Sequence, residues 1–559
     1  MKYGVARNIS ATLKANGVDH LFLLTGGDQP LFIALKEAGI RLVLARSEAS
    51  AVYMADAYAR VTGKPGLVYG QWGPGAANVA AALAEPCWAR SPVVALTSAI
   101  GTSVVNRNEY QEIDQLSMYG PVTKWNKSLG RTDRASELVR MALQVATSGC
   151  PGPVHLDLPR DILEAECDLE DPQVFGSPSL PSPDKGAISR AIELFTKADR
   201  PIVLAGAGAV LSNAANELAR LMDEFHVPVA TSMGGKGIVS DDHPLTVGVV
   251  GRYSRTVANA VLKESDCVLV VGSRLGGMVT NGNALPEPNA RVIQIDIDAE
   301  VIGLTRKRKV DIGIQADCRL ALQAFCEELA TKQQNLRYSA WTTSVQQRIL
   351  GWKQSFKQES QLAAVSGPLG PAAVIAALNE IVRDDDIVVA DTGYMGAWAG
   401  ALLNLRKPGR HFLRAAGSLG WAFPAALGAQ LAAPDARVIC VIGDGGFGYH
   451  VGDIETALRC KIPVIVIVLN NGGLAFEYQM QKYHYDTIVP EVNDFYPTDY
   501  SAIATAYGAE GARVATYDDL RTYLRRAYSS RSPYVLDVLV DRESYPPVTS
   551  YDKVRNRIL

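Results

Sequence analysis

The chain has 559 residues, too many for a single hydrophobic core, and its 48% apolar and 20% charged residues are the balance of an ordinary globular protein. Its 55 basic and 58 acidic residues give a net charge of −3, so we expect no binding to nucleic acid or to an anionic membrane. No apolar run approaches the roughly 20 residues that a membrane span needs. The eight cysteines contain no CxxC pair, which argues against a zinc site and a disulfide scaffold and favours a cytoplasmic location.

Short apolar strings rich in β-branched residues alternate with helical patterns over three stretches of the chain. Residues 1–170 contain HLFLLTGG and PVVALTS, and the Pro-rich string SPSLPSPD follows them. Residues 186–335 contain RPIVLAGAG and CVLVVGSR, residues 369–545 contain ARVICVIGDGG and PVIVIVLNN, and residues 546–559 form a tail. Strands that are apolar along their whole length are typical of parallel sheets covered by helices on both faces. We therefore predict an α/β fold of three doubly wound parallel-sheet domains, with ligands at the carboxyl ends of the strands.

In the first stretch, acidic residues follow two of the predicted strands. Asp28 lies in TGGDQ before the helical segment PLFIALKEAG, and Glu48 lies in RSEAS at the start of another helical segment. On residue type alone, Asp28 lines a pocket or caps a helix, and Glu48 is an ordinary first-turn residue favoured by the helix dipole. Small apolar neighbours in the sequence indicate that Glu48 is buried.

The second stretch carries a weak dinucleotide-binding pattern. Gly206 and Gly208 follow the strand PIVLA, but Leu211 stands where the fingerprint requires a third glycine. We therefore predict a nucleotide-type fold that serves a structural purpose in this domain.

In the third stretch, two strands end in small polar residues, GDGG and NNGG. Asp444 follows the strand RVICVI, and Asn471 follows the strand PVIVIVL. A right-handed crossover places both turns at one sheet edge, so we expect these side chains to lie side by side. Carboxylate, amide and carbonyl oxygens suit Mg²⁺, and the glycines with a helix N-terminus suit a diphosphate. Either turn alone is explained by a helix cap or a left-handed turn residue, but the pair favours a metal site.

The pattern of GDGG, a crossover helix and then NN resembles the thiamine diphosphate-binding motif of the acetolactate synthase-like decarboxylases and carboligases. The resemblance extends through GQWGPGAANVA, EYQEIDQL and AAGSLGWAFPAALGA, and it implies pyrimidine-binding, central and diphosphate-binding domains in that order. It implies thiamine diphosphate and Mg²⁺ as cofactors, with Asp444, Asn471 and the Gly473 carbonyl as metal ligands. Glu48 would activate the aminopyrimidine ring, and Gln111 would lie near the reacting carbon.

The resemblance implies further cofactor-binding residues in the first and third domains. They are Gly73, Asn78, Gly393, Tyr394, Met395, Gly417, Leu419, Gly443, Gly445 and Gly446. Leu419 would support the bent conformation of the cofactor, although a leucine at this place is on its own an ordinary core residue. In the central domain, GSRLGG stands where flavin-containing relatives have RFDDR, which argues against FAD while leaving it possible.

The residues after NN bear on which reaction the resemblance implies. Glu477 and Met480 occupy places where acetolactate synthases carry Val and Trp, whereas pyruvate decarboxylase-like enzymes carry an acid at the place of Glu477. Asp28 is a further catalytic candidate, because its turn carries polar catalytic groups in several subfamilies. We predict a thiamine diphosphate- and magnesium-dependent lyase or carboligase acting on a 2-keto acid or a 2-hydroxy ketone. The alternatives are a simple 2-keto acid decarboxylase with Glu477 as the acid, and a non-catalytic relative.

The quaternary structure also follows from the resemblance. Glu48 and Asp444 lie in different predicted domains, and relatives of this kind build each active site from two chains. The resemblance therefore implies a homodimer or homotetramer whose substrates are small keto acids and aldehydes.

Overall fold

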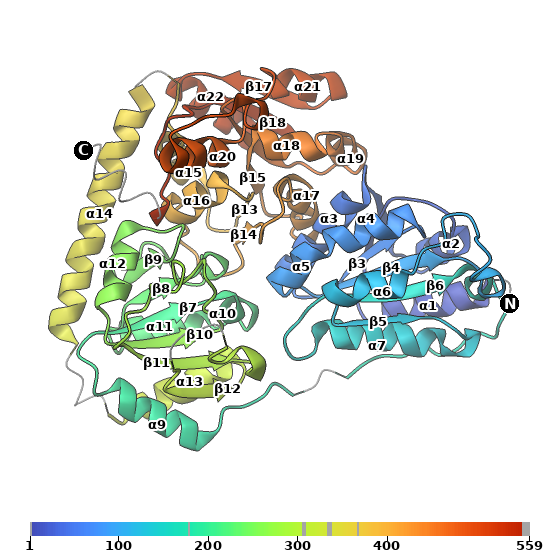
Figure 1. Ribbon diagram of the computed structural model, residues 1–559, viewed down its shortest axis with the longest axis horizontal. Helices are drawn as coiled ribbons and strands as arrows, with labels where there is room; N and C mark the ends of the chain where they lie inside the picture. Colours follow the sequence, from blue (N-terminus) through green and yellow to red (C-terminus); the bar gives the residue numbers. More distant parts are fainter. Residues whose placement is uncertain (1–2, 177–178, 305–308, 333–337, 366–367, 550–559) are drawn as a thin grey trace.

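The computed structural model describes residues 3–176, 179–304, 309–332, 338–365 and 368–549 of the chain (Figure 1). These residues form three six-stranded sheets in which every pair of neighbouring strands is parallel. The predicted α/β fold with three doubly wound parallel sheets is confirmed. Most of the predicted tail, residues 550–559, lies outside the described part of the chain.

The first sheet has the strand order β2-β1-β3-β4-β6-β5. Its strands are β1 (His20–Leu23), β2 (Arg41–Leu44), β3 (Gly66–Gly70), β4 (Val93–Ala99), β5 (Trp125–Ser128) and β6 (Val154–Pro159). Its helices are α1 (Gly4–Ala15), α2 (Gln29–Glu37), α3 (Glu48–Thr62), α4 (Pro74–Ala82), α5 (Ala84–Ala89), α6 (Gln115–Tyr119), α7 (Ala135–Thr147) and α8 (Arg160–Leu163). Alternate residues of β1 enter opposite cores, with Leu21 and Leu23 on one face and Phe22 on the other, so both faces of the sheet are covered.

The central sheet has the order β12-β11-β10-β7-β8-β9. Its strands are β7 (Pro201–Ala205), β8 (Val229–Thr231), β9 (Thr246–Val249), β10 (Cys267–Val271), β11 (Arg291–Asp296) and β12 (Ile312–Gln315). Its helices are α9 (Lys185–Phe195), α10 (Ala207–Leu211), α11 (Ala215–Asp223), α12 (Thr256–Glu264) and α13 (Cys318–Ala330), and the long helix α14 (Ser339–Val365) then runs along the side of the central and third domains (Figure 1).

The third sheet has the order β14-β13-β15-β16-β18-β17. Its strands are β13 (Ile387–Ala390), β14 (Phe412–Arg414), β15 (Val438–Gly443), β16 (Ile465–Asn470), β17 (Glu510–Val514) and β18 (Tyr534–Leu539). Its helices are α15 (Pro371–Ile381), α16 (Tyr394–Leu402), α17 (Ala422–Ala432), α18 (Asp444–His450), α19 (Asp453–Arg459), α20 (Ala475–Met480), α21 (Tyr500–Tyr507) and α22 (Tyr517–Ser529). All six residues of β16 are buried, as expected for a central parallel strand.

Apolar helix packing joins the first and third domains. Helices α3 and α17 pack so closely that a Cβ at Gly428 would lie 2.1 Å from the carbonyl oxygen of Met54. A single apolar cluster spans both domains and includes Trp421, which is fully buried. The indole Nε1 of Trp421 donates to Oδ2 of Asp56 at 2.9 Å, so a polar contact also crosses this interface.

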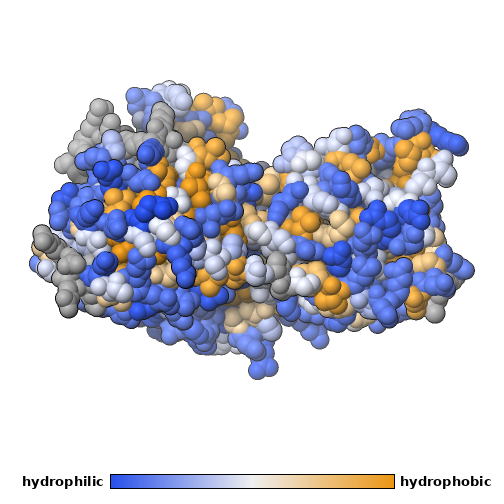
Figure 2. Space-filling view, turned by 90° about the horizontal axis from the view of Figure 1, so that it is seen from below, coloured by the Kyte–Doolittle hydropathy of each residue, from blue (hydrophilic) through white to orange (hydrophobic). Residues whose placement is uncertain are grey.

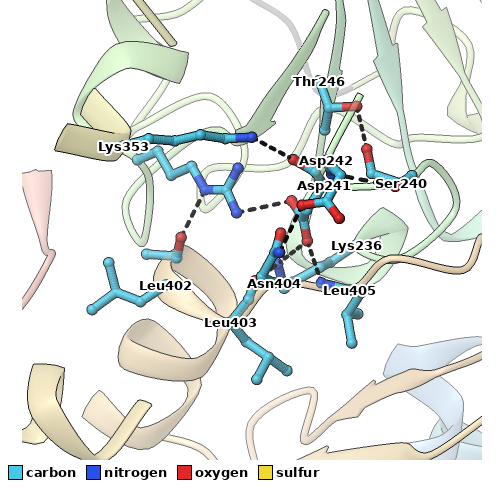
Figure 3. Close-up of polar contacts among 12 residues, drawn as sticks. Lys236, Ser240, Asp241, Asp242, Thr246, Lys353, Leu402, Leu403, Asn404 and Leu405 are labelled. Atoms are coloured by element: carbon cyan, nitrogen blue, oxygen red, sulfur yellow. Dashed lines mark hydrogen bonds and ion pairs between the residues drawn. The ribbon is translucent and has the colours of Figure 1, made fainter. Parts of the chain in front are cut away.

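A buried cluster of charges joins the central and third domains (Figure 3). Asp241 accepts from Lys236 Nζ at 3.0 Å and from an Nη of Arg255 at 2.8 Å, and all three side chains are buried. Lys236 Nζ also donates to the Leu403 carbonyl at 2.7 Å, and Arg255 Nε donates to the Ala401 carbonyl at 2.7 Å. These cations therefore satisfy carbonyl groups at the carboxyl end of α16, where the helix dipole favours positive charge.

One face of the molecule is shown in the space-filling view of Figure 2. The face in Figure 2 is largely hydrophilic, and hydrophobic residues appear on it in separate groups. In the described ranges, none of the helices combines the length and the apolar character that crossing a membrane would require.

Candidate functional site

The predicted metal ligands Asp444 and Asn471 lie at the carboxyl ends of adjacent strands. β15 and β16 pair in parallel with Gly443 opposite Leu469, and Asp444 opens helix α18 directly after β15. The Asp444 side chain is buried, and this burial raises its pKa to about 6, although hydrogen bonds from neighbouring backbone N–H groups act in the opposite direction. A bound cation would favour the ionised form of this carboxyl group.

The two asparagines after β16 have different environments. Asn470 is part of the fold, since its Nδ2 donates to Oδ1 of Asp537 at 2.8 Å and to the Thr498 carbonyl at 3.0 Å. Oδ1 of Asn471 is buried and has no hydrogen-bond partner among the described residues. A buried amide oxygen without a partner carries a desolvation cost that a ligand would remove. Asn471 therefore fits its predicted role as a metal ligand.

The available donor atoms suit Mg²⁺. Across the part of the chain that the structure describes, no group of three His, Cys, Asp or Glu side chains is arranged to hold a metal ion. The candidate set is instead one carboxylate, one amide oxygen and the backbone carbonyl of Gly473, all of which are hard oxygen donors. The chain requires glycine at this position, because a Cβ on Gly473 would lie 2.2 Å from the carbonyl oxygen of Asn493.

A pocket opens beside these ligands at the ends of β13, β15 and β16. Helices α16 and α18 begin at the glycine-containing turns that line it. Gly393 has a φ of +72°, which disfavours other residue types, and a Cβ on Gly446 would lie 2.2 Å from Oδ2 of Asp391. Two helix N-termini and close-packed glycine turns beside one pocket form a site suited to a diphosphate.

The pocket brings together nearly all the site residues predicted in the third domain. Those that line it are Gly393, Tyr394, Met395, Leu419, Gly443, Asp444, Gly445, Gly446, Asn471, Gly473 and Glu477. Gly417 is not among them: it is exposed, and its N–H donates to Oε2 of Glu85 at 3.1 Å. Sequence reasoning missed Tyr253, Asp391, Thr392, Leu474, Ala475 and Phe476. An acid directly after a strand was a readable signal for Asp391, whereas nothing in the sequence indicates that Tyr253 reaches here from the central domain.

Two buried carboxylates hold the loop that carries Leu419. Asp391 accepts a hydrogen bond from the N–H of Gly420 at 2.9 Å. Burial raises the pKa of Asp391 to about 7, although backbone N–H groups around it act in the opposite direction. Glu85 of the first domain accepts from the N–H of Ser418 at 3.0 Å. The first and third domains of one chain therefore jointly fix the position of Leu419 at the pocket.

A second cluster of predicted residues lies in the first domain around Glu48. Glu48 opens α3, whose N-cap Ser47 accepts from the N–H of Ser50. Nδ2 of Asn78 donates to Oε2 of Glu48 at 3.1 Å, and a Cβ on Gly75 would lie 3.1 Å from Oε1 of Glu48. Glu48 is only partly buried, which is less than its sequence context indicates. The predicted acid and the predicted glycine-rich segment thus meet in space.

Gln111 belongs to the same cluster. Its Oε1 accepts from Nε2 of Gln71 at 3.3 Å, and a Cβ on Gly73 would lie 2.7 Å from the Cβ of Gln111. The φ of Gln111 is +62°, an uncommon conformation for a residue other than glycine. Such backbone strain is frequent at functional sites. Gln71 is a member of this cluster that sequence reasoning did not single out.

Asp28 lies in a buried polar network. It occupies the N-cap position of α2, but its side chain makes no capping hydrogen bond. Its Oδ2 accepts from the Tyr69 hydroxyl at 3.1 Å, and its Oδ1 is buried without a partner among the described residues. Burial raises the pKa of Asp28 to about 7. The Asp28 side chain therefore does not cap α2. Its environment is compatible with a carboxyl group that holds a proton.

Among the described residues, the first-domain cluster and the third-domain pocket have no member in common. None of the residues that line the pocket belongs to the first domain, so Asp28, Glu48, Gly73, Asn78 and Gln111 all lie outside it. In the central domain, both glycines of the weak dinucleotide pattern, Gly206 and Gly208, pack against Gly272: a Cβ on Gly206 would lie 2.2 Å from the carbonyl oxygen of Gly272. This close backbone contact explains those glycines without a bound nucleotide.

Comparison with known families finds three matches in chain order. Residues 4–118 match the thiamine pyrophosphate enzyme N-terminal TPP binding domain, residues 188–325 match the central domain, and residues 391–538 match the C-terminal TPP binding domain.

Individual relatives match over most of their length. The probable acetolactate synthase large subunit of Methanococcus aeolicus is 32% identical over 558 residues, covering 95% of this chain and 91% of the relative. The probable acetolactate synthase large subunit of Methanocaldococcus jannaschii is also 32% identical, covering 99% and 94%. The acetolactate synthase isozyme 2 large subunit of Escherichia coli is 29% identical, covering 95% and 94%.

Proposed function

The chain belongs to the thiamine pyrophosphate enzyme family, and from this premise we propose that it is a magnesium-dependent carboligase or lyase acting on a 2-keto acid or a 2-hydroxy ketone. The predicted family resemblance is confirmed, and the chain is a thiamine diphosphate-dependent enzyme of the acetolactate synthase type. The observation that carries the proposal is the meeting of Asp444 and the unpartnered oxygen of Asn471 at a pocket where two helices begin.

The third domain would bind the diphosphate end of the cofactor. Asp444, Oδ1 of Asn471 and the carbonyl of Gly473 would hold Mg²⁺, and the N–H groups of the turns at Gly393 and Gly443 would donate to the phosphates. Leu419 would contact the body of the cofactor, because the carboxylates of the first and third domains fix its loop at the pocket.

Bound thiamine diphosphate supplies a nucleophilic thiazolium carbon that can attack the carbonyl of a 2-keto acid and accept the electrons released with carbon dioxide. The side chains of the protein would direct this chemistry. Glu48 would hydrogen-bond to the aminopyrimidine ring and hold the proton that the ring exchanges, with Asn78 orienting one of its carboxylate oxygens. Gln111 and Asp28 would contribute polar groups at the reacting end.

Glu477 is the acidic residue in the pocket that the metal and loop contacts do not engage. It lines the pocket beside Phe476, on the helix α20 that follows the metal ligands. In a simple decarboxylase, Glu477 would donate the proton that completes an aldehyde. In a carboligase, its protonated carboxyl group would donate a hydrogen bond to the carbonyl oxygen of the second substrate.

We also propose that the active site is completed by a second copy of the chain. The pocket contains no first-domain residue, so its own chain does not supply Glu48 to it. Exposed apolar side chains lie beside each cluster: Tyr110, Ile113 and Leu116 near Gln111, and Tyr449, Phe495 and Tyr496 near the third-domain pocket. A homodimer or homotetramer that buried these side chains would bring the clusters together. A cytoplasmic location remains our proposal, supported by eight cysteines that are all free.

The test is incubation with thiamine diphosphate, Mg²⁺ and a panel of 2-keto acids, with and without aldehyde acceptors. Carbon dioxide and the product masses would both be followed. We expect carbon dioxide and a hydroxyketone or acetohydroxy acid, and we expect neither product after Mg²⁺ is removed by EDTA or in the Asp444→Ala variant. Aldehyde as the sole product would establish the decarboxylase alternative. Tight binding of thiamine diphosphate without turnover of any substrate would instead point to a non-catalytic relative.

A further inference from the structure

Arg414 is the last residue of strand β14. Its guanidinium group forms no hydrogen bond and no ion pair with any other described residue, and its Nε is buried. Arg437 and Arg542 also have a buried, unpartnered Nε, but their remaining nitrogens are used: those of Arg437 donate to the carbonyls of Pro463 and Ala527, and one of Arg542 pairs with Asp494. A shielded guanidinium whose N–H groups lack acceptors is costly, and an anionic ligand would remove this cost.

The position of Arg414 ties it to the pocket. A Cβ on Gly396, in the first turns of α16, would lie 3.8 Å from its Nε. Burial lowers the pKa of Arg414, while the nearby Tyr253, Glu85 and Asp391 act in the opposite direction and Arg60 lowers it further. Tyr253 and Asp391 both line the pocket. Arg414 does not itself line the pocket, but it lies beside the first turns of α16, and Gly393, Tyr394 and Met395 at the start of this helix line the pocket.

Tyr253 is held firmly at this wall. It forms an isolated antiparallel bridge with Val548, and the N–H of Thr549 donates to the Arg252 carbonyl at 2.9 Å. On its other side, Arg255 is anchored by Asp241 in the buried charge cluster between the central and third domains. The segment before residue 550 and the charge cluster thus fix the only pocket residue that the central domain supplies among the described residues.

We propose that the Arg414 guanidinium, with the Tyr253 side chain beside it, binds the carboxylate of a substrate. A guanidinium matches a carboxylate with two parallel hydrogen bonds, which gives both affinity and orientation. The inference rests on the proposed function, because it assumes that the pocket takes a 2-keto acid.

The sheet order favours a substrate over the cofactor diphosphate as the source of the anion. β14 lies on one side of β13, whereas β15, which leads into the GDGG turn, lies on the other side. Residue 414 also leads directly into the loop that carries Leu419, the predicted support of the cofactor body. The anion that Arg414 meets is therefore expected at the reacting end of the site.

The experiment compares Arg414→Gln with the wild-type enzyme. Its ligands form pairs in which one member carries a carboxylate and the other lacks it. Propanoate and propanamide serve as unreactive ligands in equilibrium titrations of the enzyme loaded with thiamine diphosphate and Mg²⁺. Pyruvate, 2-oxobutanoate and propanal serve as substrates. We expect Arg414→Gln to weaken propanoate binding and raise the KM of at least one keto acid about tenfold, which corresponds to about 1.4 kcal/mol. We expect the dissociation constants of propanamide and thiamine diphosphate and the KM of propanal to change less than about twofold.

Three further variants keep the test decisive. Arg414→Lys retains the charge and is expected to recover part of the propanoate affinity, and it replaces Arg414→Gln if that variant does not fold. Tyr253→Phe is expected to weaken propanoate binding to a smaller extent. Arg410→Gln is the matched control, because the Arg410 guanidinium already donates to the carbonyls of Arg60 and Leu211. We expect this variant to leave the ratio of propanoate affinity to propanamide affinity unchanged.

Some results would overturn the inference. Equal weakening of propanoate and propanamide would show that Arg414 serves packing alone. Weaker binding of thiamine diphosphate with unchanged propanoate binding would assign the anion to the cofactor. If the wild-type enzyme turned over no keto acid at all, the proposed function would fail, but the propanoate titrations would still decide whether Arg414 binds a carboxylate.

Discussion

Two identical neighbouring residues, Asn470 and Asn471, take different roles because of a single step along the strand. Asn470 is the last residue of β16, and its amide Nδ2 donates to Oδ1 of Asp537 on the neighbouring strand β18. Asn471 is past the strand, and its amide oxygen is left without a partner among the described residues. The chemistry of the side chain is the same in both, so the difference comes from position relative to the sheet. The unpartnered oxygen is what makes Asn471 the ligand candidate.

Glu48→Gln should separate cofactor activation from cofactor binding. The amide keeps the size of the side chain and its contact with Asn78 but loses the carboxylate that holds a proton at the aminopyrimidine ring. We expect kcat to fall about 10²- to 10⁴-fold, the usual contribution of general acid–base catalysis, with the affinities for Mg²⁺ and thiamine diphosphate unchanged. Steady-state kinetics and fluorescence titration would measure the two effects.

The matched control for this variant is Glu137→Gln. Glu137 also lies in the first turn of a first-domain helix, α7, but it pairs with Arg134 at the surface at 2.8 Å. Its replacement should leave kcat unchanged. Full activity of Glu48→Gln would contradict the assignment of the activating acid.

At the scale of single residues, the sequence was informative wherever a polar residue directly follows an apolar strand. That rule found Asp444 and Asn471, because the end of a strand can be recognised from hydrophobicity and turn residues, whereas Glu48, which lies beyond the end of β2, was identified through the family resemblance. The rule could not find Tyr253, since the contact between the central domain and the pocket depends on how whole domains pack. Gly417, which the family resemblance assigns to the cofactor, does not line the pocket of the single chain, where its N–H donates to Glu85 of the first domain.

At the scale of elements, the pocket depends on a loop held by a buried carboxylate. Asp391 follows β13, is fully buried, and accepts hydrogen bonds from the N–H groups of Gly420 and Ala422 at 2.9 and 3.2 Å. These bonds connect the end of β13 to the start of α17 and set the path of the loop between β14 and α17. The apolar pattern of the strands and helices predicted the elements themselves, but not this tether, since the contact joins a turn to a distant loop.

Asp391→Asn should change the pH dependence of stability. The pKa of Asp391 is about 7 in the folded protein, above its usual 3.8, so the folded state holds this proton more tightly than the unfolded state. The group therefore contributes most stability below pH 3.8 and loses this contribution as the pH rises through about 7. The asparagine variant does not titrate. We expect the wild type to exceed the variant in free energy of unfolding by more at pH 5 than at pH 8, as measured by urea unfolding.

A second variant tests whether this pH effect belongs to Asp391. Burial alone would raise the pKa of Asp161, but hydrogen bonds from Thr102 and from the N–H of Ile162 hold this pKa below its usual value. Asp161 is ionised at both pH 5 and pH 8, so the difference in free energy of unfolding between the wild type and Asp161→Asn should be the same at both values. If Asp391→Asn also showed no change with pH, its carboxyl group would have an ordinary pKa and the tether would not depend on its protonation.

At the scale of the whole molecule, the separation of the two clusters predicts complementation between defective chains. If each active site takes Glu48 from one chain and Asp444 from another, a mixed dimer of Glu48→Gln and Asp444→Ala chains contains one intact site. Each parent variant alone contains none. Random re-association of the two inactive variants should then restore about a quarter of the wild-type activity. Light scattering would establish the oligomeric state before and after mixing.

The same mixture distinguishes a site built within one chain. Such a site would stay defective in every combination, so mixing would recover no activity. Wild-type chains mixed with either variant provide the control that re-association itself preserves activity.

A buried cluster of charges lies between the central and third domains (Figure 3). Asp241 is the shared counter-charge of Lys236 and Arg255, so Asp241→Asn leaves two buried cations without a carboxylate. We expect this variant to lose about 3–5 kcal/mol of the free energy of unfolding, the usual cost of breaking a buried ion pair from one side. Lys236→Met should cost less than half as much, because Asp241 keeps its bond to Arg255. Burial already lowers the pKa of Lys236 to about 8, which shows that its charged form is disfavoured at this position.

This difference in stability has a consequence for the site. α16 begins at the pocket with Gly393 and ends at the carbonyls of Ala401 and Leu403, which Arg255 and Lys236 bind. Loosening the carboxyl end of this helix in Asp241→Asn should also weaken binding at its amino end, so the dissociation constant of thiamine diphosphate should rise together with the loss of stability. In Lys236→Met, both effects should be smaller in the same proportion. An unchanged dissociation constant in a destabilised Asp241→Asn variant would show that the charge cluster joins the domains without positioning α16 at the pocket.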